Sequence, residues 1–278
     1  MITHPDKVLF PDVGITKGEM AAFYALVAPV MVPHLAGRPI TMERFPAGIG
    51  ATGFLQKDVV KGFPAWLKRA EAPKKGGVVH YPLANDARSL EWLANQNTIA
   101  IHVWPSRAPR LARPDLCVLD LDPSKDDPKA LRTIALSTRD RLEELGHQSW
   151  VKTSGSKGFH IVTPLGPRAT FDQSSALAER VADLLIERHP KLVTREFSKA
   201  DRGGRIFIDT GRNRMGATFV AVYSVRAKPG APVSAPCTWT EIERGKVQPQ
   251  TFRLRSMAAR LDAVGDLWGD LVKKKGKR

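Results

Sequence analysis

An apolar run that ends in two aspartates is the feature that most constrains this chain. Residues 116–121 predict a buried strand, and its period of two places Val118, Asp120 and Asp122 on one face. Pro123 cannot continue a central strand, so both carboxylates are expected where the strand ends. Two carboxylates about 7 Å apart repel each other unless a cation such as Mg²⁺ or Mn²⁺ lies between them. The alternative is a pair of acids that are simply solvated at a strand end.

A second strand repeats this pattern. Residues 206–209 are apolar and end in Asp209, with Arg212 three residues further on. A basic, glycine-rich turn that contains Arg202 precedes this strand. Two acidic strand ends beside basic turns favour a site for a metal ion and a phosphate group.

A short loop lies between two further predicted strands, 149–153 and 159–162. Its sequence is Ser154-Gly155-Ser156-Lys157-Gly158. Backbone N–H groups, two hydroxyls and an ammonium are the groups that cradle a triphosphate. The spacing is not that of a P-loop, because a strand follows the loop where a helix would be required. The alternative is an ordinary hairpin turn.

His102 lies on an alternating segment, residues 99–104, that predicts another strand. A short connection separates this segment from the Asp120 strand, which favours placing the two strands side by side in one sheet. A structural histidine with satisfied hydrogen bonds is the alternative.

The N-terminal third offers residues suited to contact with nucleic acid. Thr16 and Glu19 form a capping box, so Lys17 is expected in the first turn of a helix, where an anion is favoured, and Lys7 lies on the approach to it. Further along, a glycine-rich and mobile loop leads into Phe54 and Lys57. An aromatic ring beside basic residues suits stacking on a nucleic-acid end. A solvated charge for the lysines and an anchor in the core for the phenylalanine are the alternatives.

The rest of the chain predicts ordinary secondary structure. Helices are expected from about residue 128 to 145, with Leu145 in the buried stripe and Gly146 after it, and from Thr170 to before Pro190. Residues 217–225 predict a strand, and residues 248–271 predict one long helix. We expect one domain over residues 1–272 and a disordered basic tail over residues 273–278.

Composition narrows the classes of function. The net charge of +15 favours a polyanionic partner, with nucleic acid first, and a merely soluble basic surface is the alternative. Cys117 and Cys237 form no C-x-x-C pair, which argues against structural zinc and disulfides and fits a reducing cytoplasm. No stretch was expected to reach the length of a membrane span, and the N-terminus lacks a signal-peptide pattern.

Three segments together carry a family likeness. Residues 119–123, 153–160 and 207–209 resemble the three motifs of the archaeo-eukaryotic primase superfamily. The likeness extends from residues 4–11 to 223–226, and is closer to the polymerase domain of bacterial ATP-dependent DNA ligase D, the non-homologous end-joining polymerase. It implies an α+β fold in which two β-sheet modules with flanking helices enclose an active-site cleft.

The resemblance also implies roles for individual residues. Asp120, Asp122 and Asp209 would hold two divalent ions, Mn²⁺ or Mg²⁺. The positions that would bind the incoming nucleotide are His102, Ser154, Ser156, Lys157, Arg202, Arg212 and Arg226. The positions that would bind DNA are Lys7 and Lys17, for the 5′-phosphate, together with Phe54 and Lys57. Leu55 and Arg212 depart from the family pattern, which often has a second aromatic and a glutamine there, and His4 replaces a frequent asparagine.

The activity that the resemblance implies is template-directed addition of nucleotides to 3′ ends at DNA breaks and short gaps. It implies a preference for ribonucleotides, recognition of a 5′-phosphate, Ku and an ATP-dependent DNA ligase as partners, and a cytoplasmic location at the bacterial nucleoid. Two alternatives remain open. A metal-dependent nuclease would use the same carboxylates without a triphosphate cradle, and a non-catalytic end-binding or synapsis module would need Lys7 and Lys17 without the aspartates.

Overall fold

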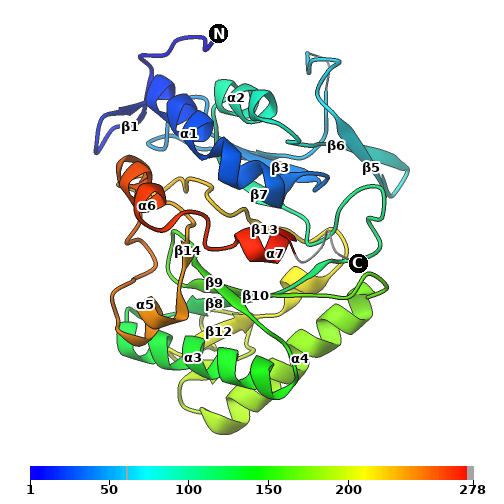
Figure 1. The fold of residues 1–278 in the computed structure, drawn as a ribbon, viewed down its shortest axis with the longest axis vertical. Coiled ribbons are helices and arrows are strands. Elements are labelled where there is room, and N and C mark those ends of the chain that lie inside the picture. The colour runs from blue at the N-terminus through cyan, green and yellow to red at the C-terminus, as the bar shows by residue number, and fades with distance from the viewer. Residues whose placement is uncertain (61, 274–278) are drawn as a thin grey trace.

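The chain folds into two β-sheet modules, one above the other in Figure 1, each with its own helices. The computed structural model describes residues 1–60 and 62–273. Buried apolar side chains of both modules belong to one main core, so the two sheets are parts of one packed body. This arrangement confirms the predicted α+β fold with two sheet modules and flanking helices.

The larger sheet has six strands in the order β11-β12-β8-β10-β9-β14. They are β8 (Leu116–Pro123), β9 (Trp150–Thr153), β10 (Phe159–Pro164), β11 (Val193–Thr194), β12 (Ile206–Asp209) and β14 (Pro236–Cys237). Strand β8 is central and runs antiparallel to both β10 and β12. Helices α3 (Pro128–Glu144) and α4 (Phe171–Arg188) pack against β8 and against each other. The predicted apolar strand at residues 116–121 is therefore the middle of this sheet.

The smaller sheet has four strands in the order β13-β7-β3-β4. They are β3 (Ile40–Arg44), β4 (Phe54–Gln56), β7 (Thr98–Val103) and β13 (Phe219–Val220). His102 lies on β7, so the expectation that its strand joins the sheet of β8 is wrong. The connection over residues 104–115 contains three prolines and carries the chain from one sheet to the other. Proline cannot donate to a sheet ladder, so this connection cannot extend β7 directly into β8.

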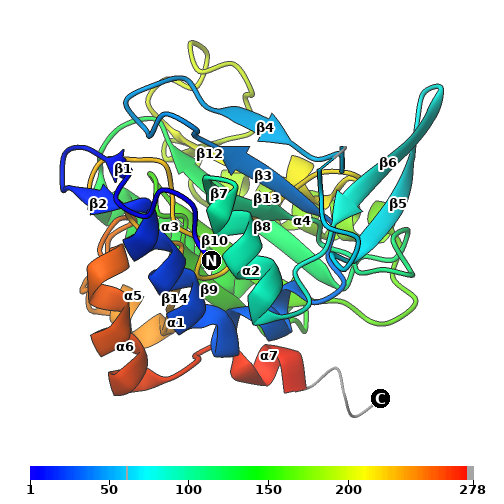
Figure 2. The same ribbon diagram turned by 90° about the horizontal axis from the view of Figure 1, so that it is seen from above.

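Two hairpins lie outside these sheets. Strands β1 (Val8–Phe10) and β2 (Ile15–Thr16) precede α1, and β5 (Arg69–Lys74) pairs with β6 (Gly77–Pro82). Figure 2 shows the β5–β6 hairpin extending away from the body of the molecule. Its apolar side chains form a small separate cluster with Trp104 and Leu111.

Helix α1 (Lys17–Leu35) begins at the predicted capping box, in which Thr16 and Glu19 exchange hydrogen bonds. Its 19 residues have a mean hydropathy of 1.2 and pass a length and composition test for a membrane span, the one helix in the described ranges to do so. The expectation that no stretch reaches this length is therefore wrong. Half of the helix is buried inside the protein, and Met20, Tyr24 and Val27 pack into the main core. The helix α2 (Ala87–Asn95) lies beside it.

Several predicted elements near the C-terminus differ from the structure. Within residues 217–225, the only named strand is the short β13. Tyr223, further along, adopts a left-handed φ of 63°, which interrupts an extended chain. The predicted helix over 248–271 is divided into η2 (Leu254–Ser256), α6 (Met257–Val264) and α7 (Gly269–Lys273). Gly265 ends α6 with a φ of 61°. Residues 274–278 of the predicted tail lie outside the described residues.

The two predicted capped helices of the larger module are confirmed in their main features. Gly146 follows α3 with a φ of 80°, and the Thr170 capping box begins α4. Leu145, however, is exposed, because α3 ends at Glu144 and Leu145 is its C-cap rather than part of its buried stripe. The remaining short elements are η1 (Gly211–Asn213) and α5 (Trp239–Glu243).

Candidate active site

Three carboxylates share one face of the larger sheet along the pairing of β8 with β12. Asp120 and Asp209 are direct partners in the antiparallel ladder, and Asp122 lies two residues beyond Asp120 on β8. Side chains on directly opposite residues have Cβ atoms about 5 Å apart. The register of two strands therefore gathers acids that are 87 residues or more apart in the sequence.

Arginines from two different turns neutralise these carboxylates. The Nη2 atom of Arg212 lies 3.2 Å from Oδ2 of Asp120 and 3.1 Å from Oδ2 of Asp209. The Nη1 atom of Arg202 lies 3.0 Å from Oδ2 of Asp122, and its other nitrogens donate to backbone carbonyls in the preceding turn. Arg202 is buried, so its guanidinium is held in a fixed position.

The two facing aspartates have pKa values shifted in opposite directions. Burial alone would raise the pKa of Asp120, but the contact with His160, together with the nearby Arg212 and Lys152, lowers it well below its usual range. Burial raises the pKa of Asp209, and the neighbouring charges of Asp120 and Asp122 add to this rise against the effect of Arg212. The surroundings therefore favour the ionised form of Asp120 and disfavour the ionised form of Asp209.

The loop between β9 and β10 is folded around Ser154. The Oγ atom of Ser154 accepts hydrogen bonds from the backbone N–H groups of Ser156 and Gly158, both at 3.1 Å. A Cβ on Gly158 would lie 1.6 Å from the carbonyl oxygen of Leu121, so only glycine allows this loop to approach β8. The exposed Lys157 is carried by this turn beside the carboxylates.

Arg226 and His102 complete the site from the other module. The Nη1 atom of Arg226 donates to the carbonyl oxygen of Ser154 at 2.8 Å. The Nε2 atom of His102 lies 3.1 Å from a carboxylate oxygen of Glu43 on the neighbouring strand β3. Burial lowers the pKa of His102, although Glu43 acts in the opposite direction. Two sheets therefore present polar groups to the same space, as the predicted cleft requires.

A cavity of about 210 Å³ joins these groups. Nine of the ten residues predicted for catalysis or nucleotide binding line it: His102, Asp120, Asp122, Ser154, Ser156, Lys157, Asp209, Arg212 and Arg226. The tenth, Arg202, reaches the cavity wall through its ion pair with Asp122.

The donor set fits a divalent cation. Carboxylate oxygens are the ligands that Mg²⁺ and Mn²⁺ prefer, and three carboxylates converge here from two adjacent strands. Within residues 1–60 and 62–273, no three Asp, Glu, His or Cys side chains are already arranged as a metal cage. The oxygens of Asp120, Asp122 and Asp209 instead contact Arg202 and Arg212.

Two residues of this site were not assigned a role from the sequence. His160 lies opposite Asp120 in the β8–β10 ladder, and its Nε2 atom is 3.3 Å from Oδ1 of Asp120. Lys152 on β9 is fully buried and contacts His160 from the other side. A lysine inside the apolar strand Trp150–Thr153 is the signal that could have marked Lys152.

The four residues predicted to bind DNA lie outside the cavity. Lys17 is buried beneath the N-terminal segment and donates to Oγ1 of Thr3 at 3.0 Å, while Lys7 is exposed. Burial and, to a smaller extent, the charge of Lys7 both lower the pKa of Lys17. Phe54 belongs to the strand β4, so the expectation of a mobile loop there is wrong. Its half-exposed ring packs beneath the guanidinium of Arg44, and Lys57 is exposed just after the strand.

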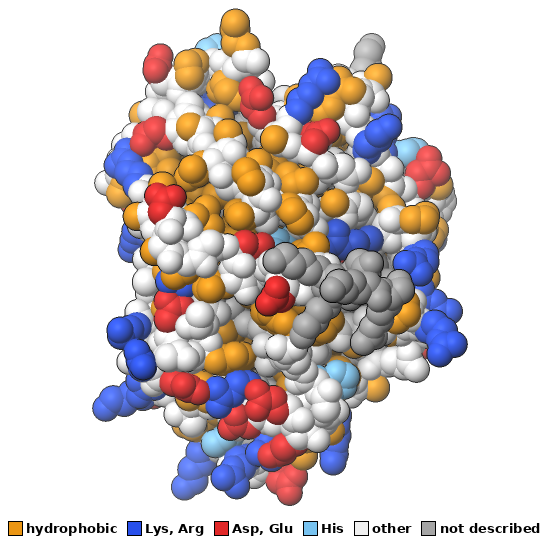
Figure 3. All heavy atoms as spheres, in the orientation of Figure 1, with side chains coloured by type: hydrophobic (Ala, Val, Ile, Leu, Met, Phe, Trp, Pro, Cys, Tyr) orange, Lys and Arg blue, Asp and Glu red, His pale blue; other side chains and the backbone are white. Residues whose placement is uncertain are grey.

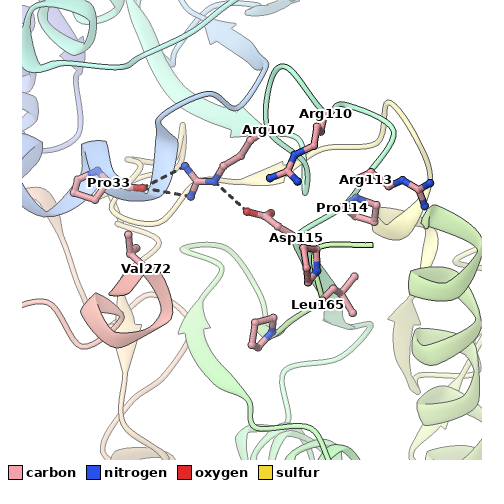
Figure 4. Close-up of a pocket in the computed structure, with 11 residues that line it drawn as sticks. Pro33, Arg107, Arg110, Arg113, Pro114, Asp115, Leu165 and Val272 are labelled. Carbon is pink, nitrogen blue, oxygen red and sulfur yellow. Dashed lines mark hydrogen bonds and ion pairs between the residues drawn. The ribbon is translucent and has the colours of Figure 1, made fainter. Parts of the chain in front are cut away.

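The largest described cavity, of about 600 Å³, is not the catalytic one. It lies at the other end of β8, roughly 20 Å away along the strand, where Arg107 contacts both Pro33 and Asp115 (Figure 4). Its wall combines Arg107, Arg110 and Arg113 with several prolines. On the face seen in Figure 3, basic side chains lie mainly along the edges and are mixed with acidic ones. The positive charge of the chain is thus not concentrated on that face.

Comparisons with known proteins agree with this geometry. Residues 16–268 match the family model described as LigD, primase-polymerase domain. The multifunctional non-homologous end joining protein LigD of Mycolicibacterium smegmatis is 38% identical over 97% of this chain, which spans 36% of that protein. The bifunctional LigD of Bacillus subtilis is 28% identical over 95% of the chain. The polymerase domain of Mycobacterium tuberculosis ligase D, solved in complex with DNA, superposes with a TM-score of 0.93 at 34% identity, covering 98% of both chains.

These matches confirm the resemblance that the three motifs carried. They cover almost all of the chain at a level of identity that establishes common descent, and they agree with the register that brings the motif residues together. The chain belongs to the LigD primase-polymerase domain family, whose members are nucleotidyltransferases.

Proposed function

We propose that this chain is a metal-dependent, template-directed polymerase that adds nucleotides to 3′ ends at DNA breaks and short gaps. The observation that carries the proposal is the pairing of Asp120 with Asp209 in one cavity with the loop that bears Ser156 and Lys157. We assign residues 1–272 to this single polymerase domain, with 273–278 as a basic tail. A cytoplasmic location at the nucleoid is part of the same proposal.

Asp120, Asp122 and Asp209 would hold two divalent ions, Mn²⁺ or Mg²⁺. Such ions, when bound, activate the primer 3′-hydroxyl and neutralise the leaving pyrophosphate. In the reaction the primer 3′-oxygen forms a bond to the α-phosphorus while the bond to pyrophosphate breaks, and the hydroxyl proton is released. The protein itself mainly positions these groups and balances charge. Arg212, now paired with Asp120 and Asp209, is placed to turn towards the triphosphate when the carboxylates take up metal, whereas the buried Arg202 stays fixed beside Asp122.

The nucleotide would be held from both modules. Lys157, Arg202, Arg212 and Arg226 supply positive charge for the triphosphate, and the free donors of the Ser154–Gly158 loop, including the Ser156 hydroxyl, supply hydrogen bonds. His102 enters from the smaller sheet beside Arg226. We include ribonucleotides and deoxyribonucleotides as substrates and expect ribonucleotides to be preferred.

The DNA would carry a 5′-phosphate at the far side of the gap, bound near Lys7 and Lys17. Phe54 and Lys57 would contact the DNA end, with Leu55 exposed where a second aromatic is frequent in the family. In the longer relatives the domain is part of a multifunctional end-joining protein, so Ku and an ATP-dependent DNA ligase are proposed as partners.

A single extension assay tests the proposal. A 5′-phosphorylated gapped DNA with a labelled primer is incubated with nucleotides and Mn²⁺, and the product length is measured. A polymerase lengthens the primer by the number of templated positions, a nuclease shortens it, and an end-binding module leaves it unchanged. Omitting the template or chelating the metal should abolish extension, and matched pools of ribonucleotides and deoxyribonucleotides in competition measure the sugar preference. Unchanged primer under all conditions would refute the proposal.

A further inference from the structure

Lys152 is a buried amine that forms no ion pair with any carboxylate of the described residues. Its side chain is 0% exposed on β9, and its Nζ atom lies 3.0 Å from Nδ1 of His160 and 2.5 Å from Oγ of Ser234. Burial lowers its pKa well below the usual value for a lysine. A buried amine with neutral partners costs stability, so an apolar residue would serve a purely structural purpose better.

The direction of the hydrogen bonds around Lys152 can be assigned. The hydroxyl of Ser234 donates to the carbonyl oxygen of Thr153 at 2.8 Å, so its oxygen is left to accept from Lys152. Lys152 has at least two N–H groups whether it is charged or neutral. One donates to Ser234, and another is available for the Nδ1 atom of His160.

The other end of His160 leads to the same assignment. Its Nε2 atom lies 3.3 Å from Oδ1 of Asp120, and a carboxylate that serves as a metal ligand can only accept. Nε2 must therefore carry the hydrogen, which leaves Nδ1 as the acceptor for Lys152. Both neighbours thus favour the Nε2–H tautomer, and among the described residues no further hydrogen bond reaches the buried ring of His160.

We infer that Lys152 is a positioning residue for the metal-binding carboxylate Asp120, acting through the tautomer of His160. His160 contacts Oδ1 of Asp120 and Arg212 contacts Oδ2, so together they set the orientation of the carboxylate. Lys152 does not touch Asp120; it acts by hydrogen-bonding to the other ring nitrogen of His160. Around metal sites, the tautomer of a histidine is commonly set by the hydrogen bond that its other ring nitrogen makes. The inference rests on the proposed function, because it takes Asp120 as a metal ligand.

Lys152→Met tests the inference, since methionine keeps the length of the side chain and removes the donor. Without that donor, His160 can move its hydrogen to Nδ1 and present a lone pair to Asp120. We expect the affinity for Mn²⁺, titrated by electron paramagnetic resonance without DNA or nucleotide, to fall roughly 10–100-fold. Lys157→Met is the matched control: it removes an ammonium from the same cavity but not from this chain of hydrogen bonds, and its affinity for Mn²⁺ should not fall.

The tautomer is read directly from the ¹⁵N spectrum of labelled histidine, with His160→Gln identifying the signal. We expect Nε2–H in the wild type and a mixture of tautomers in Lys152→Met. A wild-type His160 protonated at Nδ1 alone would overturn the inference, even if Lys152→Met failed to fold. A folded Lys152→Met with unchanged affinity for Mn²⁺ would also overturn it. If the wild type bound Mn²⁺ no better than Asp120→Ala, the metal assignment of the proposed function would fail instead.

Discussion

Asp120 and Asp209 face each other across two strands, yet their pKa values shift in opposite directions. The difference follows from their neighbours, because Asp120 also contacts His160 whereas Asp209 faces two other carboxylates. The two aspartates that end one apolar run, together with Asp209 and the basic turns, predicted this grouping from the sequence. The contribution of His160 and Lys152 could not be predicted, because it depends on which strands pair and in which register.

Asp120→Ala and Asp122→Ala should each reduce nucleotide addition at least roughly 100-fold. This is more than the loss typical of removing a residue that only hydrogen-bonds to a metal ligand. Affinity for gapped DNA should change little, since phosphate contacts elsewhere supply most of it. Single-nucleotide extension with Mn²⁺ and a DNA titration at one salt concentration measure the two effects. Near wild-type extension by either variant would show that the carboxylate is not a metal ligand.

Asp209→Asn should separate stability from activity. The raised pKa of Asp209 means that the folded state binds its proton more tightly than the unfolded state, so this group loses stabilisation as the pH rises through its range. At neutral pH the ionised carboxylate is therefore a net cost to folding, which a neutral amide of the same shape removes. We expect a Tm at pH 7 equal to or above that of the wild type, with extension reduced at least roughly 100-fold.

The same comparison at acid pH is its control. Once the wild-type Asp209 is protonated, the advantage of Asp209→Asn should shrink, so the two melting curves should approach each other as the pH falls. A Tm at pH 7 clearly below that of the wild type would show that the ion pair of Asp209 with Arg212 outweighs the cost of burial.

Helices and strands whose position depends on nearby residues were predicted correctly from the sequence. The capping boxes at Thr16 and Thr170 begin helices, and the apolar run at 116–121 forms a central strand. The predictions of one long helix over 248–271 and of a strand over 217–225 were wrong, and Gly265 and Tyr223 interrupt these segments with positive φ values. The sequence also could not reveal that His102 reaches the site from the other sheet, since that depends on how the two modules stack.

Gly158→Ala should disrupt the loop between β9 and β10 by steric exclusion. The added Cβ would collide with the carbonyl of Leu121 on β8, and this backbone cannot move without breaking the β8–β10 ladder. We expect a loss of at least about 3 kcal/mol in the free energy of unfolding, at the upper end of overpacking costs. Urea denaturation measures it. Gly166→Ala is the matched control, because nothing lies within 4 Å of its added Cβ, and it should be close to neutral. Equal stability of the two variants would contradict the close approach.

On the scale of the whole molecule, the catalytic cavity lies between two modules while the N-terminal segment lies at the end of the upper one (Figure 1). Lys17 N donates to the carbonyl oxygen of Lys7 at 2.8 Å, so the start of α1 and the N-terminal segment are joined directly. Two lysines whose backbones are hydrogen-bonded at the N-terminus of a helix place positive charge where an anion is favoured. This arrangement favours a 5′-phosphate over diffuse contact with the DNA backbone.

Replacing Lys7 and Lys17 together by alanine should therefore weaken binding selectively. Charge-assisted hydrogen bonds are worth about 1.5–3 kcal/mol each, so affinity for gapped DNA with a 5′-phosphate should fall at least roughly tenfold. Affinity for the same DNA with a 5′-hydroxyl should change much less, because the remaining basic surface still attracts the backbone. Titrations of both DNAs at one salt concentration, with the wild type and the variant, give the comparison.

Lys129 and Lys191, exposed in the lower module, provide the control pair; their double alanine variant removes the same charge and should lower both affinities slightly and equally. If the Lys7 and Lys17 variant behaved like this control, the two lysines would contribute only diffuse charge and the 5′-phosphate site would have to lie elsewhere.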